Sequence, residues 1–170
     1  MATFSERLAR QWRHWRTTAA KGRTMFPDAA LAGIGAAISA GEQRHRGEVR
    51  VIVEHSMPSD AIWSDLSNRQ RAIALFAEYG VWDTQDNCGV LIYVNLAEHK
   101  VDIVVDRAIG AKIAPATWQQ VCRSMTQGFA NGEFKASTLA AVEQVNSLLE
   151  QHFPNNGERA NELPDHPIVL

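Results

Sequence analysis

The chain has 170 residues and a hydrophobic content of 45%, which is enough for one ordinary packed domain. Charged residues make up 21% and the formal net charge is -2, so the composition favours neither a disordered chain nor wholesale nucleic-acid binding. Two cysteines, Cys88 and Cys122, are too few for a disulfide scaffold. They are typical of a reducing compartment, although counts alone leave a single bridge open.

The first 23 residues form a basic segment on an otherwise acidic chain. They contain six Lys or Arg side chains and one acidic side chain, Glu6. Apolar side chains recur within this segment at helical spacing: Phe4, Leu8, Trp12 and Trp15. Residues 1–25 are therefore predicted to form a basic amphipathic helix. Three roles are open for such a helix: docking on its own domain, lying on an anionic membrane surface, or contacting a partner or nucleic acid.

Residues 29–40 are small and apolar and follow a basic stretch, as in an export signal. Pro27 and Asp28 interrupt the front of this region, and Gly33 and Gly35 weaken its apolar character. No stretch approaches the ~20 apolar residues that a spanning helix requires. We therefore expect neither an export signal nor a membrane anchor, and a location that is cytoplasmic or peripheral to the inner membrane.

The remaining elements are predicted from hydrophobic periodicity and from Gly and Pro breakers. In chain order they are a helix over 28–41, a strand over 48–55, a helix ending at Tyr79-Gly80, strands over 89–96 and 101–107, a helix from Pro115, and a last helix ending near Phe153. The strand 89–96 is nearly all apolar, which is typical of a central strand covered on both faces. After Pro154 the sequence is polar, so 155–170 is predicted to be a mobile tail.

This order of elements implies an α/β fold with three layers. A right-handed crossover makes the first two strands parallel, and a reversal over 97–100 makes the third strand antiparallel. The expected domain, 26–154, is thus a small mixed sheet, a βαβ crossover plus a β-hairpin, with helices on both faces.

Several of these segments resemble the TPM domain family, named for a thylakoid lumen protein, a photosystem II repair protein and a worm receptor-associated protein. The resemblance covers about 26–154 and rests on ALFAEYGV at 74–81, DNCGVLI at 86–92, VDIVVDRAI at 101–109, and the stretch from Gly128-Phe129 to Phe153-Pro154. It is nearest to a bacterial branch described as membrane-associated proteins of unknown function. Family members have been linked to acid phosphatase activity, to calcium binding and to the assembly or repair of membrane complexes, so the resemblance implies these functions as candidates.

Candidate metal ligands are predicted at the end of the sheet where the second strand begins. Asp83, Asp86 and Asn87 lie in the loop that enters this end, and antiparallel pairing about 97–100 would place Asp106 near Leu91. Three carboxylates, an amide and loop carbonyls are the oxygen ligands that Ca²⁺ or Mg²⁺ requires. Ordinary roles are also open for these side chains, in turn hydrogen bonds, ion pairs or caps.

Arg107 follows the last of these carboxylates and is the candidate catalytic residue, because a guanidinium there would steady a phosphate group. A rival site at the opposite end of the sheet combines histidine and carboxylate: Glu54, His55, Glu98 and His99. Because Glu98 and His99 fall in the predicted hairpin turn, we expect both to be solvated surface residues.

Two functions from different classes follow. The preferred one is an interaction or accessory module, in which residues 1–23 bring an acidic domain to a membrane surface or a membrane-bound protein, with a divalent cation as a candidate ligand. The alternative is a divalent-cation-dependent phosphatase of low specificity. No phosphate loop, paired CxxC, His-Glu-x-x-His or Gly-x-Ser-x-Gly motif adds a stronger catalytic signal. No nucleic-acid partner is expected, and the sequence leaves the oligomeric state open.

Overall fold

A computed structural model of the chain describes residues 3–157 and 160–170. Its centre is a four-stranded sheet in the order β3-β2-β1-β4. The strands are β1 (Glu48–Glu54), β2 (Gly89–Asn95), β3 (Lys100–Val105) and β4 (Ile168–Val169). β1 pairs in parallel with both β2 and β4, whereas β3 is antiparallel to β2. The predicted parallel crossover and the hairpin are both confirmed.

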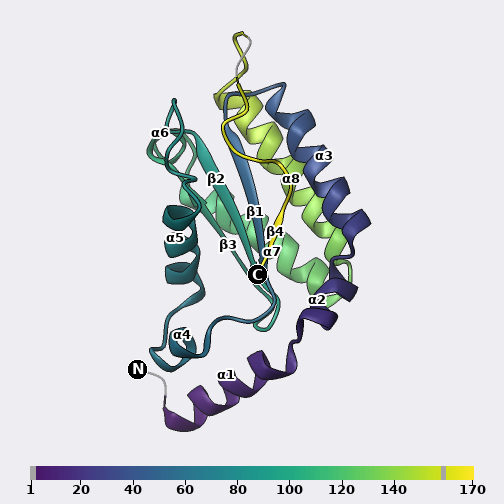
Figure 1. The fold of residues 1–170 in the computed structure, drawn as a ribbon. Coiled ribbons are helices and arrows are strands. Elements are labelled where there is room, and N and C mark those ends of the chain that lie inside the picture. The colour runs from purple at the N-terminus through teal and green to yellow at the C-terminus, as the bar shows by residue number, and fades with distance from the viewer. Residues whose placement is uncertain (1–2, 158–159) are drawn as a thin grey trace.

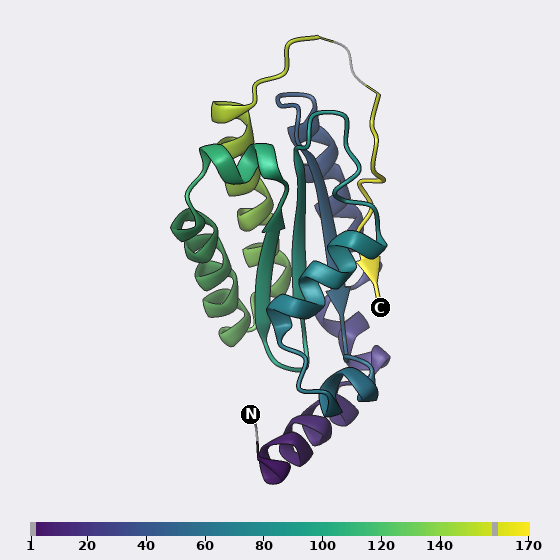
Figure 2. The same ribbon diagram turned by 90° about the vertical axis from the view of Figure 1, so that its left-hand side faces the viewer.

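Helices cover the two faces of this sheet (Figures 1 and 2). One face carries α3 (Asp28–Glu42), α7 (Pro115–Ala130) and α8 (Phe134–His152), and the other carries α5 (Asn68–Glu78). Two short helices, α4 (Ser59–Trp63) and α6 (Arg107–Lys112), were not expected from the sequence. The α/β class with helices on both faces of a small mixed sheet is therefore confirmed.

Alternate residues along each strand enter two hydrophobic clusters, one on each side of the sheet. Val51 and Ile92 belong to the larger cluster beneath α3, α7 and α8, whereas Ile52 and Leu91 belong to the cluster beneath α5. β1 and β2 are buried along their whole length. Burial on both faces explains the nearly continuous apolar sequence of β2.

The N-terminal segment folds as two helices, α1 (Phe4–Arg16) and α2 (Ala19–Met25), where a single helix was expected. Thr18 separates the two helices, because its side chain accepts a hydrogen bond from the backbone N–H of Lys21 and so caps the N-terminus of α2. α1 lies across the end of the sheet, beside α4 and the β2–β3 turn, while α2 leads into α3 (Figure 1). None of the helices in the described part of the chain combines the length and apolar character needed to cross a membrane.

The C-terminal segment differs from the mobile tail that was expected. Ile168 and Val169 form β4 against β1, and Leu163 is buried in the cluster beneath α5. The physical reason is Arg50, which is buried in β1 and donates hydrogen bonds to carbonyl oxygens of this segment, including that of Pro164. A buried guanidinium requires such acceptors. Residues 158–159 of the expected tail, and residues 1–2 of the expected N-terminal helix, lie outside the described residues.

The close packing at the start of β2 leads to a testable prediction. A Cβ atom at Gly89 would lie 1.8 Å from the carbonyl oxygen of Val81, which is backbone and has no rotamer by which to move away. We expect Gly89→Ala to lower the free energy of unfolding by at least ~2 kcal/mol, measured by urea denaturation. Gly157→Ala is the matched control, because its Cβ would meet no atom of residues 3–157 and 160–170 within 4 Å. That variant should change stability by less than ~0.5 kcal/mol, and equal effects at the two sites would contradict the packing argument.

Candidate functional site

The residues predicted as metal ligands lie near the start of β2, with a register that differs from the prediction. The chain reverses over 96–99, one residue earlier than expected, so Lys100 pairs with Asn95 and Val105 pairs with Val90. Asp106 therefore lies opposite Gly89, to whose carbonyl oxygen its backbone N–H donates at 2.9 Å. The expected placement beside Leu91 is wrong because the earlier reversal shifts the partner of Asp106 by two residues along β2.

Asp106 caps the short helix α6. Its Oδ1 accepts a hydrogen bond from the backbone N–H of Arg107 at 2.6 Å, and its Oδ2 is buried with no hydrogen-bond partner among the described residues. Arg107, the predicted catalytic residue, is the first residue of α6 and is exposed to solvent. A role for Arg107 in holding phosphate stays a prediction.

The other predicted ligands have local roles in the preceding loop. Asp86 forms an ion pair with Arg46 at 3.3 Å. Asn87 adopts a left-handed backbone conformation with φ of 52°, and Asp83 is exposed in a turn. In the portion of the chain that the structure describes, no three His, Cys, Asp or Glu side chains are grouped so as to hold a metal ion. Binding of Ca²⁺ or Mg²⁺ by these residues therefore stays a prediction.

The capping role of Asp106 can be measured directly. We expect Asp106→Ala to lower the free energy of unfolding by ~1 kcal/mol, because the first turn of α6 loses its side-chain acceptor. Asp83→Ala, in the exposed turn, should change stability by less than ~0.5 kcal/mol. Urea denaturation of both variants tests this, and an equal loss in the two would show that Asp106 has no capping role.

The rival cluster at the opposite end of the sheet is divided between separate networks. Glu54 is buried and accepts hydrogen bonds from Arg71 and from the Tyr93 hydroxyl, each at 2.6 Å. Burial, reinforced by the negative charge of Glu54, raises the pKa of Tyr93 well above its usual range. His55 contacts the carbonyl oxygen of Leu170. The structure thus places Glu54 and His55 in internal contacts of the fold.

Glu98 was expected to be a solvated turn residue, and this expectation is wrong. Its side chain is only 3% exposed. One carboxylate oxygen accepts from Arg10 Nε at 2.5 Å and from His14 Nε2 at 3.1 Å, and the other accepts from Lys100 Nζ at 2.8 Å. Burial alone would raise the pKa of Glu98, but these hydrogen bonds outweigh burial and hold the pKa well below its usual range. We call this group, Glu98 with Arg10 and His14, the Glu98 clasp.

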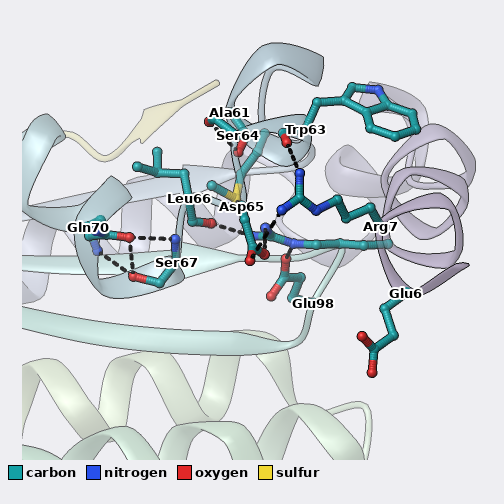
Figure 3. Close-up of polar contacts among 12 residues, drawn as sticks. Glu6, Arg7, Ala61, Trp63, Ser64, Asp65, Leu66, Ser67, Gln70 and Glu98 are labelled. Atoms are coloured by element: carbon teal, nitrogen blue, oxygen red, sulfur yellow. Dashed lines mark hydrogen bonds and ion pairs between the residues drawn. The ribbon is translucent and has the colours of Figure 1, made fainter. Parts of the chain in front are cut away.

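Further polar contacts join α1 to α4 and to the residues on either side of α4 (Figure 3). Arg7 donates to the carbonyl oxygen of Trp63 at 2.8 Å, and Arg10 donates to that of Leu66 at 2.7 Å. His14 Nδ1 accepts from the backbone N–H of Met57 at 3.0 Å, so Nε2 carries the proton directed at Glu98. The face of α1 that docks on the domain is therefore its polar face.

The apolar face of α1 consequently points away from the domain. Trp12 is 56% exposed and Trp15 is 69% exposed, and their ring centroids lie 5.1 Å apart. Leu8 is also exposed, and Phe4 lies at the edge of this face with its ring 6.0 Å from that of Trp63. An amphipathic helix on a globular domain ordinarily buries its apolar stripe. We call these exposed side chains the α1 apolar face: Phe4, Leu8, Trp12 and Trp15.

Positive charge accompanies the α1 apolar face. Four basic side chains of α1 and α2 are exposed: Arg13, Arg16, Lys21 and Arg23. No ion pair involves these four within residues 3–157 and 160–170. The surface thus combines large apolar groups with cations whose charge is not neutralised by the domain.

Sequence reasoning found the amphipathic pattern but missed how the helix docks. The spacing of Arg7, Arg10 and His14 could have indicated a polar docking face, because the three side chains share the helix face opposite the tryptophans. Their partners were not predictable in the same way, because Glu98 lies in a turn and Leu66 contributes only a backbone carbonyl. The candidate functional site is therefore the outward apolar face that the Glu98 clasp creates.

The clasp can be tested by hydrogen exchange at the Met57 amide, which donates to His14 and so reports detachment of α1. Glu98→Gln should cost ~2 kcal/mol of docking free energy at neutral pH and speed exchange at Met57 about thirtyfold. The pKa of Glu98 in the docked state lies below its usual value of 4.5. The ionised carboxylate therefore contributes its full stabilisation of docking above pH 4.5, and this stabilisation is lost as the pH falls below 4.5.

The difference between wild type and Glu98→Gln should thus shrink by ~1 kcal/mol at about pH 3.5, after correction for intrinsic exchange rates. Glu133→Gln, at an exposed glutamate elsewhere on the surface, is the matched control and should leave exchange at Met57 unchanged. A difference independent of pH would show that the charge on Glu98 does not stabilise docking.

Comparisons with known proteins agree with this fold. The sequence profile described as the TPM domain matches residues 20–148. The NMR structure of the BA42 protein from the psychrophilic bacterium Bizionia argentinensis is similar, with a TM-score of 0.73 and 24% sequence identity over 83% of this chain and 92% of that one. No curated protein matches the chain significantly. At this identity the solved structure supports the fold alone.

Proposed function

The chain belongs to the TPM domain family, and we propose that it is a TPM-type interaction module that binds anionic membrane surfaces through the α1 apolar face. The observation that carries this proposal is the inverted docking of α1, in which Arg10 and His14 face the domain while Trp12 and Trp15 face solvent. Two further features of the same surface support a lipid partner.

The chemistry of the exposed side chains suits the interface of a bilayer. Tryptophan is enriched at the headgroup level of membranes, where one side of the ring meets hydrocarbon and the other meets water. Trp12 and Trp15 stand side by side with Leu8 one turn away, as in helices that lie in the plane of a membrane surface. An apolar group of this size is unusual on a protein surface without a binding role.

The charges select an anionic surface. Arg13 and Arg16 flank the tryptophans on α1, and Lys21 and Arg23 extend the positive charge along α2. Each such cation contributes ~1 kcal/mol near an anionic membrane, and the contribution decays within about 10 Å at ordinary salt concentrations. A purely apolar partner would draw no benefit from these groups, so charge complementarity favours acidic lipids.

Docking also sets how the domain sits on the membrane. Because the Glu98 clasp joins α1 to the β2–β3 turn, α1 lies at one end of the sheet and the start of β2, with Asp86 and Asp106, lies at the other (Figure 1). A membrane bound by α1 would therefore leave the Asp106 end directed toward the surrounding solution. In this proposal the protein is a peripheral adaptor whose distal end is available to a second component.

Vesicle co-sedimentation tests the proposal. We expect the full chain to bind vesicles of phosphatidylcholine and phosphatidylglycerol, and to bind pure phosphatidylcholine at least about tenfold more weakly. Trp12→Ala with Trp15→Ala should weaken binding by a factor of about a hundred or more, because two interfacial aromatic anchors are lost. Added salt should weaken wild-type binding as the charges are screened.

The matched control is Trp82→Ala, since Trp82 is 54% exposed, similar to Trp12, but lies on the domain away from α1. Its binding should equal that of wild type. Failure of the full chain to sediment with anionic vesicles at low salt would overturn the proposal, as would equal losses in the Trp82 and Trp12–Trp15 variants.

A further inference from the structure

A cavity of about 580 Å³ runs beside the outer edge of β3, between α5 and α7. This size lies within the range of about 300–1,000 Å³ that is usual for small-molecule sites. The cavity is separate from α1 and from the predicted cation ligands. Its lining combines apolar side chains with a few polar groups, among them Ile103, Trp118, Asp102, Arg69, Arg123 and Cys122.

The free edge of β3 is not available for pairing with a further strand. The side chain of Arg69 donates a hydrogen bond to the carbonyl oxygen of Ile103, in the middle of the strand. On the other side, the Cys122 sulfur contacts the backbone of the same residue. Adding an extended peptide would require both contacts to break. The occupant that fits this cavity is therefore a small molecule.

The ring of Trp118 forms part of the cavity wall. Its side chain is buried at 5% exposure, and its indole N–H has no hydrogen-bond partner among the residues that the structure describes. The indole nitrogen is itself covered, so the cavity presents the apolar ring of Trp118 to a ligand and not its N–H.

The charges around the cavity favour an anion. Arg69 and Arg123 line it together with a single carboxylate, that of Asp102. Asp102 already accepts a hydrogen bond from Asn68 at 2.7 Å and lies 3.8 Å from the guanidinium of Arg69. Burial raises the pKa of the Cys122 thiol to about 11, so it adds no negative charge at neutral pH. The lining is thus net positive beside apolar walls.

We propose that this cavity binds a small organic anion with an apolar body. The apolar body lies against Ile103 and the Trp118 ring, and the anionic group is held by Arg123 and Arg69. Arginine suits carboxylate recognition because its fork of donors matches the two oxygens. This site is independent of membrane binding by α1.

Titration of the full chain with naphthoate, followed by nitrogen–proton correlation spectra of the indole groups, tests this proposal. The chain has five tryptophans, and the Trp118 signal is assigned by elimination using Trp→Phe variants of the four exposed ones. We expect naphthoate to shift the Trp118 indole signal, and the neutral naphthylmethanol to bind at least about fivefold more weakly. Arg123→Gln should weaken naphthoate binding by a similar factor.

Arg123 is exposed, so its replacement should leave the fold intact, which the amide signals of the same spectra verify. Lys135→Gln, at an exposed cation on α8 that belongs neither to this cavity nor to the α1 apolar face, is the control and should leave naphthoate affinity unchanged. Equal affinity for naphthoate and naphthylmethanol would overturn the proposal. Shifts confined to Trp12 and Trp15 would overturn it as well, because they would place the probe on the α1 apolar face.

Discussion

The buried carboxylate of Glu98 is the constraint on which the placement of the N-terminal helix depends. A charge removed from water must be paired and hydrogen-bonded, or its burial becomes prohibitively costly. Arg10 and His14 meet this requirement together with Lys100, and both of the α1 residues lie on the same helix face. Satisfying Glu98 therefore turns the polar face of α1 inward. Its apolar face is left in solvent as a direct consequence, so one interaction accounts for both the docking of α1 and the surface proposed to bind membranes.

The same principle operates in β1, where three charged residues are buried: two of them bind the C-terminal segment and the third binds α5. Glu48 accepts a hydrogen bond from the backbone of Leu163 at 3.2 Å, and Arg50 donates to carbonyls of the adjoining C-terminal residues. Glu54 is paired with Arg71 of α5 at 2.6 Å. The apolar residues of the sheet are covered by α3, α5, α7 and α8 without any contribution from the tryptophans of α1. Buried charges thus fix α1 and the C-terminal segment, while hydrophobic packing, together with the Glu54–Arg71 pair, fixes the three-layer centre.

This division explains how much could be predicted from the sequence. The strands and the main helices follow from local periodicity, as in Val51 and Ile52, which alternate between the two clusters. The amphipathic character of α1 is equally local, and the sequence predicted it correctly. The docking of α1 was not predictable, because His14 contacts Glu98, which lies 84 residues away and has the sequence context of an ordinary turn residue. β4 comprises only Ile168 and Val169, too few residues to show any period, and its position depends on long-range acceptors for Arg50.

The most direct test of this account is the solvent exposure of the tryptophan indoles and of the Met57 amide in the free protein, measured by signal loss on addition of a soluble gadolinium chelate. With α1 docked through its polar face, the indole signals of Trp12 and Trp15 should broaden strongly, while those of the Met57 amide and of the buried Trp118 are spared. Protection of Trp12 and Trp15 to the level of Trp118 would show that the apolar face of α1 is turned onto the domain. That result would contradict both the Glu98 clasp and the membrane-binding surface derived from it.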